Sequence, residues 1–147
     1  QKINEGALKG VAPELFYVDP IDLFTMQIQG SGVVKLSDKK QVTVTYAGQN
    51  GHSYVPIGRH LFDIIPKEKM TLNAIESHLR SLPEPEAQKV MELNPSFVFF
   101  KPTTGAGLTF LGTEVVPGRT IATDASFFPK GALAYLEYEK PEFESLD

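Results

Sequence analysis

The chain has 147 residues, of which 41% are hydrophobic and 22% charged, ordinary globular values that exclude wholesale disorder. It contains no cysteine, which excludes disulfides, thiol catalysis and cysteine-bound metal clusters. The formal net charge of −4 comes from the acidic stretch at residues 137–147, and without clustered Lys and Arg we expect no nucleic-acid partner.

Four segments have the apolar patterns of strands: residues 23–28, 32–36, 41–46 and 96–101. The second and third flank a four-residue turn at 37–40, which predicts a β-hairpin. The fourth contains three phenylalanines and predicts a strand buried on both faces. Weaker strands are predicted at residues 108–111, 119–123 and 133–138.

The middle of the chain predicts three helices. Pro56 can take the first-turn position of a helix whose apolar face runs from Ile57 to Ile65. Thr71 can cap a second helix with apolar residues at 72, 75, 79 and 82, and Met70 and Ile75 stand at the positions of a hydrophobic staple. A third helix is predicted over residues 85–93, ended by Asn94 and Pro95.

Residues 102–118 are rich in glycine and proline and predict a connection between two bodies. Residues 1–101 hold every predicted helix, and residues 119–147 read as strands too few to bury a core alone. The expected fold class is therefore mainly β with a few helices (α+β). Because the chain starts at Gln1 and stops after a predicted strand, we expect a fragment or processed product of a longer protein.

The three histidines do not have the spacing of metal ligands. His60 and His78 flank apolar helix faces, and His52 lies in a polar turn. No metal site is expected from this pattern.

Two segments, residues 26–32 and 46–54, are unusually polar for strand ends and rich in glycine. Their amides, hydroxyls and tyrosine rings, without net charge, suit a neutral, hydroxyl-rich ligand such as a sugar chain. Two glycine-rich turns with satisfied polar side chains would explain the same residues. The candidate substrate-binding residues are Gln27, Gln29, Gly30, Ser31, Tyr46, Gly48, Asn50, Gly51, His52 and Tyr54.

A series of short motifs spans nearly the whole chain: DPID (19–22), QIQGSG (27–32), YAGQNGH (46–52), IGR (57–59), NPSFVFF (94–100), VPGR (116–119), ATD (122–124) and PKG (129–131). In this order and spacing they closely resemble the membrane-bound lytic murein transglycosylase A (MltA) family. The resemblance implies an enzyme that cleaves the β-1,4 bond between N-acetylmuramic acid and N-acetylglucosamine in peptidoglycan and leaves a 1,6-anhydro ring.

The resemblance also implies an architecture and a location. Family members have a double-psi β-barrel into which a β-barrel-type domain is inserted, with glycan in the groove between them. Residues 1–101 then correspond to most of the inserted domain, without its N-terminal part, and residues 119–147 to the return into the catalytic barrel. The implied partners are peptidoglycan glycan strands at the periplasmic side of the outer membrane, with membrane contact only through a lipid anchor outside this chain. No cofactor is implied.

The chain departs from the family pattern in its aspartates. Of three characteristic aspartates only the first is matched, at Asp124, which is expected to support catalysis. The main acid/base aspartate is expected beyond Asp147, and a turn cap is the alternative role for Asp124. A non-catalytic glycan-binding module and a protein-interaction domain remain the alternative functions, which the gene sequence beyond Asp147 would discriminate.

Overall fold

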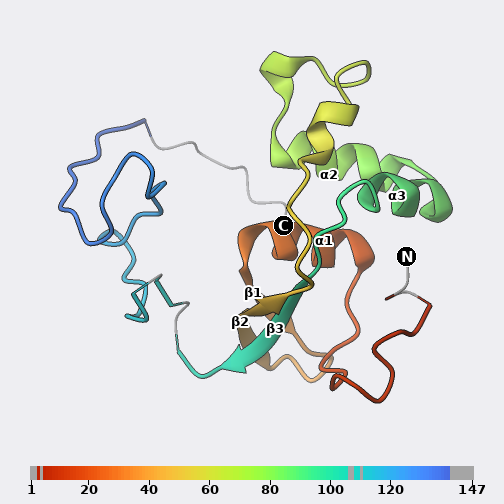
Figure 1. Cartoon of the computed structure of the whole chain (residues 1–147), viewed down its shortest axis with the longest axis horizontal. Helices are drawn as coiled ribbons and strands as arrows, with labels where there is room; N and C mark the ends of the chain where they lie inside the picture. The colour runs from red at the N-terminus through yellow and green to blue at the C-terminus, as the bar shows by residue number, and fades with distance from the viewer. Residues whose placement is uncertain (1–2, 4, 106–107, 110, 140–147) are drawn as a thin grey trace. The chain divides into compact units, whose positions relative to one another are not determined.

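The computed structural model describes residues 3, 5–105, 108–109 and 111–139. The chain divides into two compact units, Gln1–Gly107 and Leu108–Asp147, and the division falls within the segment predicted as a connection. The first unit contains the helices and strands drawn in Figure 1. Their bounds are α1 (Pro20–Gln29), β1 (Ser31–Lys35), β2 (Gln41–Gln49), η1 (Ile57–His60), η2 (Lys67–Lys69), α2 (Leu72–Ser81), α3 (Glu84–Met91) and β3 (Val98–Thr103). Antiparallel strands together with helices make this unit α+β.

The three strands form an antiparallel sheet in the order β1-β2-β3. Strand β1 pairs with β2 from Ser31↔Thr45 to Lys35↔Gln41, so the predicted hairpin is confirmed. The N–H of Leu36 donates to the carbonyl of Lys40 at 2.8 Å, and Lys39 takes a φ of +66° to complete the turn. The register of β2 against β3 shifts between Tyr46 and Gly48, which is where the predicted polar segment 46–54 begins.

The predicted strand at residues 23–28 is wrong, because this segment lies inside helix α1. Asp19 caps the helix, its carboxylate accepting from the N–H groups of Ile21 and Asp22 at 3.0 Å each. Pro20 takes the first helical position. Gly30 ends the helix with a φ of +78°, and its N–H donates to the carbonyl of Met26 at 2.8 Å. The apolar residues alternate, but the buried Phe24 follows Ile21 at helical spacing.

The two later helix predictions are confirmed. Thr71 caps α2, its hydroxyl accepting from the N–H of Ala74 at 3.1 Å. The side chains of Met70 and Ile75 both lie against Gly58, which agrees with the predicted staple. Helix α3 begins one residue before the predicted start, with Glu84 and Glu86 in its first turn.

The helix predicted from Ile57 to Ile65 is wrong in length and type. Only the four-residue 3₁₀ helix η1 forms, followed by a turn in which the N–H groups of Ile64 and Ile65 donate to the carbonyl of Leu61. Gly58 has low helix propensity, and Pro56 provides no side-chain cap for the first turn. The separate turns still bury Ile57, Leu61 and Ile65.

The core of the first unit joins the helices. Its cluster of buried residues consists of Phe24, Ile57, Leu79, Ala87 and Met91. The cluster draws one or more residues from α1, η1, α2 and α3, and helix α1 also contacts β1. Figure 1 shows α1, in orange, beside the strands. Helix α1 therefore contacts both the sheet and the helical part.

Strand β3 is confirmed near its predicted position, but its expected burial on both faces is wrong. Val98, Phe99 and Phe100 are half-buried. The reason is position in the sheet, since β3 ends the three-strand order and pairs with β2.

The strands predicted in the second unit are wrong for the residues that the structure describes. Leu108 pairs with Glu114 in an isolated bridge, and no regular strand forms in residues 119–139. A strand needs a hydrogen-bonded neighbour as well as an apolar pattern. Leu133 and Tyr135 are 101% and 92% exposed, so this segment buries neither side chain within the chain. Residue 110, which belongs to the predicted strand at 108–111, and residues 140–147, which end the predicted second body, lie outside the described residues.

Candidate functional site

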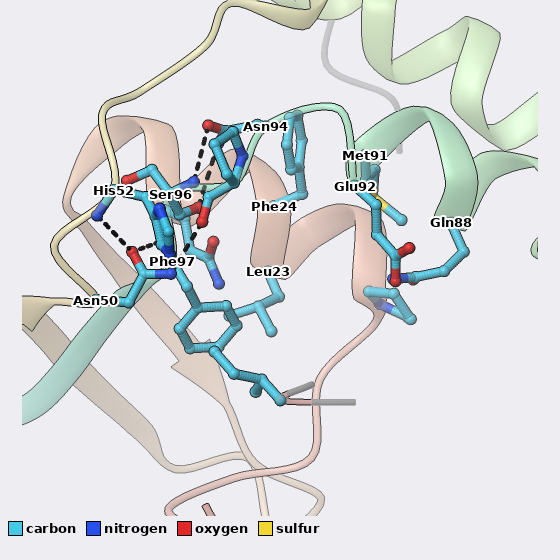
Figure 2. A pocket seen from close by; sticks show the side chains of 14 residues that line it. Leu23, Phe24, Asn50, His52, Gln88, Met91, Glu92, Asn94, Ser96 and Phe97 are labelled. Atoms are coloured by element: carbon cyan, nitrogen blue, oxygen red, sulfur yellow. Dashed lines mark hydrogen bonds between the residues drawn. The ribbon is translucent and has the colours of Figure 1, made fainter. Parts of the chain in front are cut away.

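A cavity of about 460 Å³ opens on the first unit where α1, the turn after β2 and the end of α3 meet. Figure 2 shows Leu23 and Phe24 of α1 opposite the chain around Asn94 and Phe97, with Asn50 and His52 beside them. The cavity is lined by Ile3, Pro20, Leu23, Phe24, Gln27, Asn50, His52, Gln88, Met91, Glu92, Asn94, Pro95, Ser96 and Phe97.

The lining of this first cavity combines an apolar surface with neutral polar groups and one carboxylate, that of Glu92. Leu23, Phe24 and Phe97 are apolar, and the ring of Phe97 packs edge-on against Phe99 with centroids 5.3 Å apart. Amide, imidazole and hydroxyl groups are supplied by Gln27, Asn50, His52, Gln88, Asn94 and Ser96. Such a surface can hold a neutral ligand that has both apolar faces and hydrogen-bonding groups.

A second cavity, of about 550 Å³, lies between α1 and β1. Gln29 and Ser31, from the polar bend at the end of α1, line it. Asp19, Asp22 and Lys35 line it too, so its lining carries charged groups of both signs.

The predicted substrate-binding residues are distributed over several places. Gln27, Asn50 and His52 line the first cavity, whereas Gln29 and Ser31 line the second. Tyr46 and Tyr54 are each 50% exposed and line neither cavity. The structure therefore brings together three of the candidates from segments that the sequence could only treat separately.

Three of the candidates are glycines with backbone roles. Gly30 ends α1, Gly48 follows the register shift of β2, and Gly51 has a φ of +85° in the turn that leads to His52. A side chain at Gly30 or Gly51 would meet open space, so the positive φ alone explains the glycine there.

The second wall of the first cavity was not predicted from the sequence. Gln88 and Glu92 lie at the end of α3, and the amide of Gln88 donates to the carboxylate of Glu92 at 3.0 Å. Asn94, Ser96 and Phe97 follow directly. The motif NPSFVFF at 94–100 was the available signal, but its first residues were assigned to ending a helix and starting a strand.

Asp124 lies in the second unit and caps a turn. Its carboxylate accepts from the hydroxyl of Ser126 at 2.6 Å and from the N–H of Ser126 at 2.8 Å. These hydrogen bonds, with the nearby charge of Lys130, lower the pKa of Asp124 below its ordinary value. An ionised Asp124 can orient or stabilise a positive group, but it is poorly suited to donate a proton.

Within the described residues, no three His, Asp or Glu side chains gather in a way that could hold a metal ion. No described helix is long and apolar enough to cross a membrane.

The chain is similar to proteins of one family. A family model described as the MltA specific insert domain matches residues 1–101. A protein of Vibrio cholerae named membrane-bound lytic murein transglycosylase A is 38% identical over 135 residues, which cover 88% of this chain and 37% of that protein.

Two solved structures extend the similarity to the fold. The crystal structure of Escherichia coli MltA with bound chitohexaose matches with a TM-score of 0.78 at 34% identity, covering 87% of this chain and 39% of that one. MltA from Neisseria gonorrhoeae matches with a TM-score of 0.68 at 38% identity, covering 80% of this chain and 29% of that one. The chain thus spans less than half the length of each of these three proteins.

Proposed function

The chain belongs to the MltA family, and from this premise we propose that it is part of a peptidoglycan lytic transglycosylase. The names of its relatives support this function, and so does the lining of the first cavity, whose polar groups are mostly uncharged. The proposed substrate is the glycan strand of peptidoglycan, cut at the β-1,4 bond between N-acetylmuramic acid and N-acetylglucosamine. Because the relatives are named membrane-bound, we also propose the periplasmic side of the outer membrane as its location.

The proposed reaction needs one carboxyl group and no water. The carboxylic acid gives its proton to the glycosidic oxygen, which leaves with the N-acetylglucosamine. The 6-hydroxyl oxygen of the N-acetylmuramic acid bonds to its own C1 and closes the 1,6-anhydro ring, and its proton passes to the carboxylate. Since this nucleophile is on the same ring as the bond that breaks, it acts at a high effective concentration. An ordinary glycosidase needs a second carboxylate at this step.

We propose that residues 1–101 form the inserted domain that walls the glycan groove, and that residues 119–147 belong to the catalytic double-psi β-barrel. The bounds of the family model and the division between residues 107 and 108 support this assignment. The exposed apolar side chains of residues 133–138 agree with it, because barrel strands form only beside their partners. In this proposal Asp124 supports catalysis as an ionised carboxylate, and the acid/base aspartate lies outside the chain.

The proposed glycan contact rests on one observation, which is that Gln27 and His52 both line the first cavity. Titrating N-acetylglucosamine oligosaccharides into ¹⁵N-labelled chain is expected to shift the amide signals of these residues, with those of Ser31 and Tyr54 following. Cello-oligosaccharides, which lack the acetamido group, serve as the control ligand and are expected to bind less tightly. Shifts confined to α2, which lines neither cavity, would contradict the assignment.

A pair of variants tests whether His52 contacts the oligosaccharide. His52→Ala is expected to weaken oligosaccharide binding by about five- to tenfold, the worth of one hydrogen bond. His60→Ala is the matched control, since His60 lies in η1 and lines neither cavity. Incubating the full-length protein with murein sacculi then separates enzyme from binding module, because only the enzyme releases 1,6-anhydromuropeptides.

A further inference from the structure

Asn50 ties the turn after β2 to the chain that follows α3. Its side-chain N–H donates to the carbonyl of Pro95 at 2.9 Å, and its side-chain oxygen accepts from the N–H of Phe97 at 3.0 Å (Figure 2). The same oxygen accepts from the N–H of His52 at 3.4 Å. The backbone N–H of Asn50 donates to the carbonyl of Phe97 at 3.0 Å. Only an oxygen can accept from two N–H groups, so these donors fix the orientation of the amide.

Asn94 makes the reciprocal connection from the other segment. Its side-chain oxygen accepts from the N–H of Val55 at 3.0 Å, across 39 residues of sequence, and from the N–H of Ser96 at 3.2 Å. Its side-chain N–H donates to the carbonyl of Ser96 at 3.3 Å. Each asparagine thus holds the backbone of the other's segment. We call Asn50 and Asn94 with these partners the asparagine clasp.

The clasp uses most of the hydrogen-bonding capacity of the two side chains. An amide oxygen has two lone pairs, and in both asparagines two N–H donors occupy them. One N–H of each amide is bonded to a backbone carbonyl, which leaves at most one N–H for another partner. His52 and Tyr54, by contrast, lie between the two attachment points of their turn, at residues 50 and 55.

We propose that Asn50 and Asn94 are positioning residues, which hold residues 51–54 in place so that His52 faces the glycan at the first cavity. The inference rests on the proposed function and reassigns Asn50 from a glycan contact to a positioning role. Pre-ordering the turn lowers the entropy lost on binding, so the clasp contributes to affinity without touching the sugar.

Asn50→Asp tests the clasp, because a carboxylate keeps both acceptor sites but presents an oxygen to the carbonyl of Pro95. At pH 7 the carboxylate and the carbonyl of Pro95 repel each other and open the clasp. The hydrogen-exchange protection of the Phe97 amide is therefore expected to fall by about tenfold or more, the equivalent of one lost hydrogen bond. Oligosaccharide affinity should fall with it. At about pH 3.5, near the ordinary pKa of an aspartate, the protonated carboxyl can donate again and both quantities should return toward wild type.

Two controls distinguish the loss of the clasp from the general effects of an added negative charge and of low pH. Gln49→Glu adds the same charge one residue away, keeps the acceptor for the N–H of Gly51, and should leave the exchange of the Phe97 amide unchanged. His52 and Glu92 are the titratable side chains that line the same cavity, so each variant is compared with wild type at the same pH. If Asn50→Asp fails to fold, Asn94→Ala reports on the same clasp through the exchange of the Val55 amide.

The outcomes distinguish this inference from the proposed function. Loss of affinity with unchanged exchange at Phe97 would make Asn50 a direct glycan contact and overturn the positioning role. Faster exchange with unchanged affinity would overturn it as well. A full-length wild-type protein that binds no oligosaccharide would instead refute the proposed function, while the exchange measurements would still decide whether the clasp forms.

Discussion

At the scale of single residues, Arg80 and Asp19 connect α2 to the start of α1. The guanidinium of Arg80 lies 3.3 Å from the carboxylate of Asp19 and 3.0 Å from that of Glu76, and it also pairs with Asp22. The hydrogen bond to Glu76, with the charges of Asp22 and Asp19, raises the pKa of Arg80. Because these side chains are largely exposed, solvent screens the pairs and their contribution to stability is modest. The cap that Asp19 provides for α1 is the stronger local effect.

We therefore expect Asp19→Ala to lower the free energy of unfolding at pH 7 by about 1 kcal/mol, and Asp19→Asn, which keeps the acceptor, by less. The backbone N–H of Asp22 is the main group that lowers the pKa of Asp19 below 3.8, with Ile21 and Arg80 adding to it. The part of the stabilisation that depends on the charge of Asp19 is thus present above about pH 4. It is lost as the pH falls through the pKa of Asp19 in the folded protein. Urea unfolding at pH 7 and pH 3 measures this, and equal stability of wild type and Asp19→Ala at pH 7 would contradict it.

At the scale of elements, helix α1 connects the core to both cavities. Phe24 belongs to the buried cluster, Gln27 lines the first cavity and Gln29 the second. The helix is held in place by packing against α2, where Leu79 is 1% exposed. Because Phe24 and Met91 belong to this core and also line the first cavity, the position of the candidate site depends on how the core packs.

Leu79→Ala is expected to lower the free energy of unfolding by about 2–5 kcal/mol, because it removes buried methyl groups and leaves a cavity among α1, α2 and α3. Leu93→Ala is the control, since Leu93 is 43% exposed and its truncation should change stability by about 0.5 kcal/mol or less. Urea unfolding followed by circular dichroism compares the two variants. Similar losses in both would show that Leu79 is not a core residue.

At the scale of the whole chain, the two units differ in what they bury. The first unit has a core that joins its helices, whereas the described residues of the second expose large apolar side chains such as Phe127, Leu133 and Tyr135. Asp124, which the sequence motifs predict to be a family aspartate, belongs to this second unit. Its lowered pKa suits a supporting carboxylate and not a general acid.

The chain by itself is accordingly expected to release no 1,6-anhydromuropeptides from murein sacculi. Loss of a general acid costs on the order of 10²–10⁴ in rate, and the other wall of the groove would also be missing. Chromatography of the digested sacculi is the measurement, and the full-length protein is the positive control. Product from the 147-residue chain would require an acid within it and would overturn the role given to Asp124.

The sequence by itself determined the features that depend on neighbours in the chain. A short polar turn between two segments of alternating polarity was enough to predict the hairpin. Thr71 before a helical apolar pattern was enough to predict α2. The motifs along the chain were sufficient to identify the family. The glycan-binding residues that the sequence proposed remain predictions.

The tertiary structure decided the features that depend on distant partners. Residues 23–28 alternate like a strand, yet packing of Phe24 against α2 and α3, with the cap at Asp19, makes them helical. Residues 119–139 carry strand patterns but form no regular strand among the described residues, because an apolar pattern does not supply a neighbour. Asn50 meets Pro95 and Phe97 across more than 40 residues, and no local pattern encodes that contact. Hydrogen-bond partners and packing faces are fixed only when the chain has folded, and these decide which polar residues bind a ligand and which hold the fold.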